Sequence, residues 1–245
     1  MDFGYMEDDL RRVRAGIEEA ATAVGRDAGE VVLLAAVKSG TPEELDYLHR
    51  VLGVNVFGEN RVQQFLSHYE ALNSPNLHWH FIGSLQKNKV KYIIDKVDMI
   101  QSLDSVGLAA EIERQAVRVG HVMDVLIEIN CGREAAKGGV MPEEAEALAL
   151  ALRDFPHIKL RGFMTMAPKC ENSEKYTEYF RETYNLVLDI WVKKLHNIRE
   201  ELVLSMGMSQ SYREAVACGS TMVRVGRSLF AGRPETGENG NPPTP

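Results

Sequence analysis

The apolar residues of this chain fall into short continuous runs, separated by longer stretches in which they recur every three or four positions. The first run covers residues 31–37, and turn residues follow directly after Lys38. A run of this length and composition is typical of a strand that is buried on both faces. We therefore expect Lys38 at the carboxyl end of a core strand, with its stem packed and its amine facing whatever lies at the strand ends. The simpler interpretation is that Lys38 marks where a strand meets water.

The same alternation continues along the chain. Residues 6–24 predict an amphipathic leading helix, and Thr41 supplies an N-cap for a helix that begins at Pro42. Seven more strands are expected, at residues 54–58, 77–82, 98–101, 122–130, 158–165, 201–205 and 222–225. Helices are expected at residues 41–52, 59–72, 85–95, 105–119, 141–154, 173–196 and 212–218, with a short helical stretch after the last strand.

Strands that alternate with helices predict a parallel sheet. Eight such units in about 200 residues favour one α/β domain, a single (β/α)8 TIM barrel with an extra N-terminal helix, over an open sheet. We assign residues 1–232 to this barrel domain. Residues 233–245 are rich in Gly, Pro and Asn and poor in apolar residues, so we expect a disordered tail.

Charge and cysteine content narrow the class of protein. The net charge is −7, with 28 basic and 35 acidic residues, which disfavours nucleic-acid and anionic membrane partners. Cys131, Cys170 and Cys218 lack the spacing of a metal site or a disulfide framework, as expected in a reducing compartment. No apolar run is long enough for a secretory signal or a membrane helix. We expect a cytoplasmic monomer without a bound metal.

Two glycine-containing loops predict an anion site. In a TIM barrel, function lies at the carboxyl ends of the strands, and phosphate sites favour the loops after strands seven and eight. Here these loops are residues 205–209 and 226–228, and both combine glycine with hydroxyl side chains ahead of a helical turn. Free N–H groups and hydroxyls together form a cradle for an anion. Plain turns are the alternative.

Arg224 interrupts the otherwise apolar final strand. A guanidinium cannot lose its charge, so it needs a partner. The partner is either an interior acid or a ligand atom, such as a ring nitrogen or a phosphate. Pyridoxal 5′-phosphate (PLP) would match all three features: its aldehyde suits Lys38, its phosphate the loops and its pyridine nitrogen Arg224. Desolvation and a nearby cation would keep the Lys38 amine partly neutral for a Schiff base.

Five long segments, in order along the chain, carry a resemblance to a known family: residues 33–38, 57–63, 79–89, 204–209 and 219–230. They resemble the pyridoxal phosphate homeostasis proteins, also called the YggS or PROSC family. The resemblance implies a barrel like the N-terminal domain of alanine racemase. It also implies seven cofactor-binding residues: Lys38 for the Schiff base, Arg224 for the pyridine nitrogen, Ser209, Gly226 and Arg227 for the phosphate, and Asn60 and His80 in the pocket.

The resemblance also marks Lys137, in the loop after the fifth strand, as a second aldehyde-reactive amine. Two positions depart from the family: Val37 stands where serine is frequent, and Arg227 stands where many members have threonine. The first departure leaves Lys38 intact, and the second affects only the detail of phosphate binding.

The function implied by the resemblance is a non-catalytic one in vitamin B6 homeostasis, in which the protein holds PLP and releases it to apo-enzymes. A PLP-dependent racemase needs a second acid/base group, and in alanine racemase a further domain supplies it; only a short tail follows the barrel here. One alternative is a slow amino-acid racemase that uses Lys38 and a group such as His80. A Schiff-base aldolase of the barrel type is another.

Overall fold

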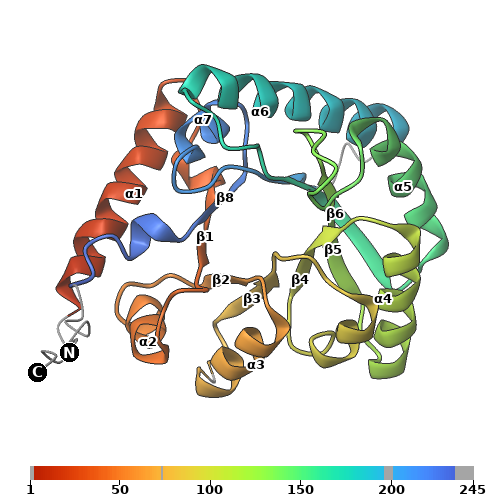
Figure 1. Ribbon diagram of the computed structural model, residues 1–245, viewed down its shortest axis with the longest axis horizontal. Helices are drawn as coiled ribbons and strands as arrows, with labels where there is room; N and C mark the ends of the chain where they lie inside the picture. Colours follow the sequence, from red (N-terminus) through yellow and green to blue (C-terminus); the bar gives the residue numbers. More distant parts are fainter. Residues whose placement is uncertain (1–2, 73, 196–200, 235–245) are drawn as a thin grey trace, which may run out of the picture.

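Eight parallel strands close into one barrel at the centre of the computed structural model, which describes residues 3–72, 74–195 and 201–234 (Figure 1). Neighbouring strands follow the chain order, and the last strand pairs with the first. The strands are β1 (Val32–Ala36), β2 (Val56–Glu59), β3 (His78–Phe81), β4 (Met99–Leu103), β5 (Met123–Ile129), β6 (Ile158–Thr165), β7 (Val203–Ser205) and β8 (Met222–Val225). The predicted TIM barrel is confirmed.

Helices surround the barrel and cover its strands (Figure 1). The α-helices are α1 (Gly4–Thr22), α2 (Pro42–Arg50), α3 (Val62–Ala71), α4 (Val106–Val119), α5 (Ala145–Ala151), α6 (Ser173–Leu188) and α7 (Tyr212–Ala217). Short 3-10 turns are η1 (Ala28–Glu30), η2 (Lys87–Tyr92), η3 (Pro142–Glu144), η4 (Leu152–Asp154) and η6 (Arg227–Leu229). The extra N-terminal helix is α1, and it packs against α7 and η6.

Local sequence signals set several of these boundaries. The Thr41 side chain and Glu44 form a reciprocal capping box at the start of α2, with Pro42 at its first position. The Ser105 hydroxyl accepts from Leu108 N at the start of α4, and Gly120 ends that helix at a φ of 67°. Strands β6 and β8 have the predicted bounds.

Two predicted helices differ from the structure. Only the 3-10 turn η2 forms within residues 85–95, where the buried residues Ile93 and Ile94 are β-branched and disfavour a helix. The helix predicted at residues 173–196 is α-helical to Leu188 and then widens into a π-helical turn, η5 (Asp189–Lys194). The wider turn lets the adjacent Ile190 and Trp191 both be buried. Residue 196, its predicted end, lies outside the described residues.

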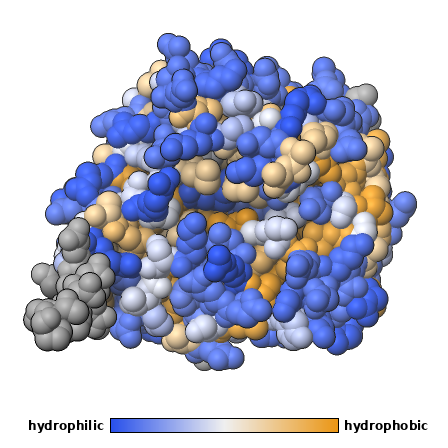
Figure 2. Space-filling view, in the orientation of Figure 1, coloured by the Kyte–Doolittle hydropathy of each residue, from blue (hydrophilic) through white to orange (hydrophobic). Residues whose placement is uncertain are grey.

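The first strand is not buried on both faces throughout, contrary to the prediction. Val32 is 39% exposed, whereas Leu34 and Ala35 are fully buried. The apolar run therefore extends beyond the fully buried part of the strand, at the end where the strand enters the barrel. In the view of Figure 2, hydrophilic residues dominate the surface, and apolar residues are visible between and beneath them.

No helix among the described residues is long and apolar enough to cross a membrane. The same residues contain no cluster of three or more His, Cys, Asp or Glu that could hold a metal ion. The predicted tail begins at residue 233, and residues 235–245 lie outside the described part. Arg233 itself is ion-paired with Glu44 of α2.

Candidate functional site

Lys38 lies in the turn after β1 and is exposed. The strand ends at Ala36, and Val37 is the last buried residue before this turn. The turn is held at two points: the Gln64 side chain donates to Lys38 O, and Arg233 Nη2 donates to Ser39 O at 2.8 Å. The amine is thus accessible on a fixed backbone.

The two predicted anion-binding loops meet at Ser209. Its hydroxyl accepts from Gly226 N and from Ser228 N, both at 3.3 Å, at the start of η6. Gly207 has a φ of 91°, a conformation that favours glycine, and its carbonyl accepts from Arg224 N. Hydroxyl and N–H groups from both loops therefore converge, as a phosphate cradle requires.

Gly226 brings this cradle next to the end of β1. A Cβ on Gly226 would lie 2.8 Å from Ala36 O, so a larger residue would push the two segments apart. Ala36 precedes Lys38 by two residues, and Arg224 precedes Gly226 by two residues. Gly226 thus lies where three features meet: the turn that contains Lys38, the cradle, and strand β8 with Arg224.

Arg224 is 3% exposed and lies inside the barrel. Its Nη1 donates to Ser205 O at 2.8 Å and to Ser205 Oγ at 2.7 Å, and its Nη2 donates to Thr165 O at 2.8 Å. Burial lowers the pKa of Arg224 to about 10, against the opposing effect of Glu128. The side chain therefore stays charged at neutral pH. A guanidinium has about five N–H donors. Three donors of Arg224 bond Ser205 and Thr165, and the others remain available to a ligand.

Glu128 is the buried acid whose charge acts on Arg224. It was not among the residues predicted from the sequence. It is 5% exposed, and burial raises its pKa to about 7, although Arg224 lowers it and Asp104 raises it further. No ion pair within 4 Å joins Glu128 and Arg224 among the described residues. The raised pKa favours the neutral carboxyl group, which weakens the competition of Glu128 with a ligand for Arg224.

His80 is buried inside the barrel, and its Nδ1 lies 2.8 Å from Gln101 Nε2. Burial lowers the pKa of His80 to about 4; Asp98 opposes this effect and His78 adds to it. The imidazole is therefore neutral at pH 7. Gln101 in turn accepts from Ser205 Oγ at 2.7 Å, so His80 and Arg224 are connected through Gln101 and Ser205.

The barrel interior has two layers. The apolar layer consists of Met99, Leu126 and Met164, which form a small core cluster of their own. Two residues beyond Met99 and Leu126, on the same face of β4 and β5, lie Gln101 and Glu128, which form a polar layer with Ser205 of β7 and Arg224 of β8. In β4 and β5 the polar layer is therefore the one nearer the carboxyl ends.

Three predicted residues are not joined to this network by any hydrogen bond among the described side chains. Asn60 follows β2 and is half-buried, whereas Arg227 and Lys137 are exposed. Asn60 is close to the loop after β3, because a Cβ on Gly83 would lie 2.3 Å from Asn60 O. Their roles in binding stay predictions.

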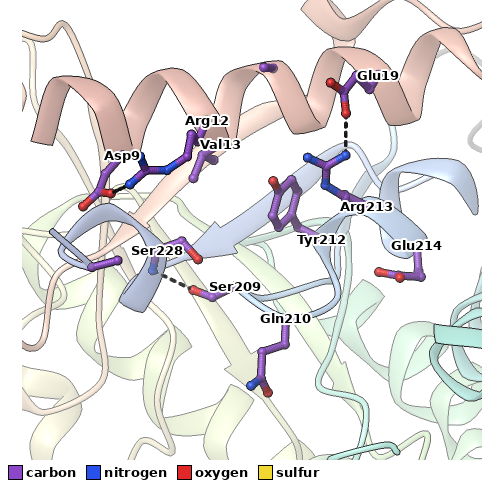
Figure 3. Close-up of a pocket in the computed structure, with 12 residues that line it drawn as sticks. Asp9, Arg12, Val13, Glu19, Ser209, Gln210, Tyr212, Arg213, Glu214 and Ser228 are labelled. Atoms are coloured by element: carbon purple, nitrogen blue, oxygen red, sulfur yellow. Dashed lines mark hydrogen bonds and ion pairs between the residues drawn. The ribbon is translucent and has the colours of Figure 1, made fainter. Parts of the chain in front are cut away.

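A groove of about 600 Å³ lies on the outer side of the cradle, between α1 and the segment around Ser209 (Figure 3). Its two arginines are already paired: Arg12 bonds Asp9 and Arg213 bonds Glu19. Both arginines of the groove therefore have acidic partners, whereas Arg224, inside the barrel, bonds only neutral oxygen acceptors among the described residues.

Comparison with known proteins places the chain in a family. The family "Alanine racemase, N-terminal domain" matches residues 9–234. The pyridoxal phosphate homeostasis protein of Aquifex aeolicus is 42% identical over 233 residues, covering 91% of this chain and 96% of that protein. The pyridoxal phosphate homeostasis protein of Escherichia coli K12 is 34% identical over 233 residues, covering 92% of this chain and 95% of that protein. The chain belongs to the pyridoxal phosphate homeostasis protein family.

Solved structures agree with this family. PipY of Synechococcus elongatus, solved with PLP bound, has a TM-score of 0.75 and 28% identity, and covers 87% of this chain and 99% of its own. An alanine racemase of Clostridium difficile has a TM-score of 0.69 at 18% identity, covering 91% of this chain but 56% of its own. The second likeness concerns the fold alone. The family resemblance expected from the sequence is thus confirmed.

Within this member of the pyridoxal phosphate homeostasis proteins, sequence reasoning missed Gln101 and Glu128, and it placed Ser205 in the anion-binding loop without its contacts to Arg224 and Gln101. A signal was present for Glu128: it is an acid inside the apolar run of β5, as Arg224 is a base inside β8. Gln101 likewise follows two apolar residues in β4. The same rule applied to every strand would have found them.

Proposed function

We propose that this protein is a PLP carrier in vitamin B6 homeostasis, which holds the cofactor on Lys38 and releases it to apo-enzymes. The observation that carries this proposal is the junction at Gly226. The junction brings a lysine turn, an N–H and hydroxyl cradle and a buried arginine to the carboxyl ends of adjacent strands. The PLP-bound PipY structure and the names of the relatives support it.

The donor set fits the chemistry of the cofactor. A bound phosphate would replace the Ser209 hydroxyl as the acceptor of the Gly226 and Ser228 N–H groups, and that hydroxyl would then donate to the phosphate, with Arg227 as a further candidate. The donors of Arg224 not used by the protein would face the ring nitrogen, and this charged guanidinium would keep that nitrogen unprotonated. PLP itself supplies an aldehyde that condenses reversibly with the Lys38 amine, with loss of water.

A spectroscopic comparison of two lysine variants tests this proposal. Purified wild type, Lys38→Ala and Lys137→Ala would be mixed with PLP, and the visible absorption of the imine recorded. Borohydride reduction and peptide mass mapping would then locate the modified lysine. We expect the band and the tag at Lys38 in wild type and Lys137→Ala, and neither in Lys38→Ala. A tag that stays elsewhere in Lys38→Ala would contradict the proposal.

A second candidate function, slow amino-acid racemisation, is favoured by Glu128. A carboxyl group whose pKa is about 7 can accept and donate a proton near neutrality, whereas His80, whose pKa is about 4, does not change its protonation there. Exchange of the Cα hydrogen of alanine in D₂O would measure this activity. If exchange occurs and Glu128→Gln abolishes it, the protein is an enzyme as well as a carrier. If wild type shows no exchange, only the carrier role stands.

A further inference from the structure

A continuous line of side-chain hydrogen bonds crosses the barrel interior from β8 to β3. Arg224 Nη1 lies 2.7 Å from Ser205 Oγ, Ser205 Oγ lies 2.7 Å from Gln101 Oε1, and Gln101 Nε2 lies 2.8 Å from His80 Nδ1. All four side chains are buried. The line connects Arg224, which always carries its protons, to His80, whose neutral ring has two tautomers.

Arg224 sets the direction of every bond in this line. A guanidinium only donates, so Ser205 Oγ must accept from it and direct its own proton elsewhere. The acceptor within reach is Gln101 Oε1, which places the Gln101 amide nitrogen next to His80. Because that nitrogen donates, His80 Nδ1 must accept.

Met222 disfavours the reversed orientation of the Gln101 side-chain amide. Gln101 Nε2 also lies 3.1 Å from Met222 Sδ, a weak acceptor, so both amide protons have partners. In the reversed orientation, Gln101 Oε1 would face this sulfur. The Ser205 hydroxyl proton would then have no acceptor in a buried site, which costs about 1–3 kcal/mol for such a group.

We infer that Gln101 is a positioning residue that fixes His80 as the neutral tautomer with its proton on Nε2, while it orients Ser205 beneath Arg224. The low pKa of His80, caused by burial, agrees with a ring that carries one proton. His80 Nε2 bonds no other described residue, so its N–H is available to a ligand. If the proposed carrier function holds, the site presents N–H donors from both His80 and Arg224 and selects ligand atoms that accept.

The protein without cofactor provides the first test, which is independent of PLP binding. Nitrogen NMR of ¹⁵N-histidine-labelled protein at neutral pH distinguishes the two tautomers and the imidazolium, and His80→Gln identifies the signal by its loss. We expect the Nε2–H form in wild type. An Nδ1–H or doubly protonated ring would overturn the inference.

Gln101→Glu is the deciding variant, because it replaces the amide donor by an acceptor of the same shape. The proton should then appear on Nδ1, either as the other tautomer or as the imidazolium. Gln86→Glu makes the same change at an exposed side chain and should leave the signal unchanged. An unaltered His80 signal in folded Gln101→Glu would refute the role of Gln101.

Ser205→Ala supplies a milder variant if Gln101→Glu does not fold. It disconnects Arg224 from Gln101, so the amide can reverse and both tautomers should be populated. In PLP-loaded protein, either variant should release the cofactor about tenfold faster, the effect of one hydrogen bond. If the NMR signals change but the release rate does not, Gln101 fixes only the His80 tautomer. Its proposed role in orienting Ser205 beneath Arg224 would then be wrong. Absence of PLP binding in wild type would instead refute the carrier proposal and leave the NMR result standing.

Discussion

The two layers of the barrel interior share strands β4 and β5, yet they differ in chemistry. The apolar layer fills its space with Met99, Leu126 and Met164, which need no partners. In the polar layer, Arg224, Ser205 and Gln101 each depend on a neighbour to satisfy buried donors and acceptors. Burial stabilises the first layer and imposes a cost on the second unless every group is paired.

This difference separates stability from binding within one barrel. The polar layer lies nearer the carboxyl ends, where a barrel binds its ligand, and it keeps unused donors on Arg224. Mutations in the apolar layer should therefore change the free energy of unfolding and leave PLP release unchanged. Mutations of Arg224, Ser205 and Gln101, which the hydrogen-bond line connects, should instead act mainly on PLP binding and release.

The largest expected effect is in the apolar layer. Leu126 is fully buried, so Leu126→Ala should lower the free energy of unfolding by about 2–5 kcal/mol through the cavity that it leaves. Urea unfolding followed by circular dichroism measures this loss. The rate of PLP release from the folded variant should match wild type. A large increase in that rate would show that the two layers are not separate.

Next in size is the pH dependence caused by Glu128. Burial raises the pKa of this carboxyl group from 4.5 to about 7, so the folded protein binds the proton more tightly than the unfolded chain does. The resulting stabilisation is complete below about pH 4.5 and is lost as the pH rises through about 7. Glu128→Gln should thus be more stable than wild type at about pH 8, by on the order of 2–3 kcal/mol.

Urea unfolding of wild type, Glu128→Gln and Glu70→Gln at several pH values checks this prediction. Glu70 is exposed, so its variant should follow wild type at every pH. A difference between Glu128→Gln and wild type that does not change with pH would argue against the buried, titrating carboxyl.

Arg224→Met should affect binding more than stability. Methionine is apolar and of similar length, so the variant avoids the desolvation of a buried charge while it leaves the Ser205 and Thr165 acceptors unpaired. PLP affinity should fall about 10- to 100-fold, as expected for about 1.5–3 kcal/mol from a charge-assisted hydrogen bond. Fluorescence titration measures it, with the exposed Arg118→Met as control. Unchanged affinity would remove Arg224 from the site.

The smallest effect is expected for Met164→Leu. This exchange keeps the volume of a fully buried apolar side chain, so the cost should stay below about 1.5 kcal/mol. Thermal unfolding and PLP release would both be measured. A marked change in release from so mild a variant would mean that the apolar layer supports the site directly.

Much of the fold could be predicted because its signals are local. The eight apolar runs and the caps at Thr41 and Ser105 depend on neighbours in the sequence. The errors arose where packing decides: the π-helical turn that buries both Ile190 and Trp191, and the uncovered start of β1 at Val32. Neither is visible in the periodicity of a single segment.

The site was predictable only in part for the same reason. Lys38, Arg224 and the cradle loops were predicted from their positions at strand ends and from the family resemblance, and the structure brings them to adjacent strand ends. Gln101 became significant only when β4 faced β7 and β8 across the barrel, a contact between residues more than 100 positions apart. Such cross-barrel partners cannot be read from spacing along the chain.

The tie between Arg233 and the lysine turn has a practical consequence for protein engineering. Gly232 N bonds Asp9 of α1, and Arg233 bonds Ser39 O and Glu44, so the last described residues lie beside Lys38. A tag or reporter fused after them would start next to Lys38 and would shield its amine, which we propose to hold PLP. The turn at His121, between α4 and β5, lies at the opposite end of the barrel and is exposed, so it is the better insertion point for a label.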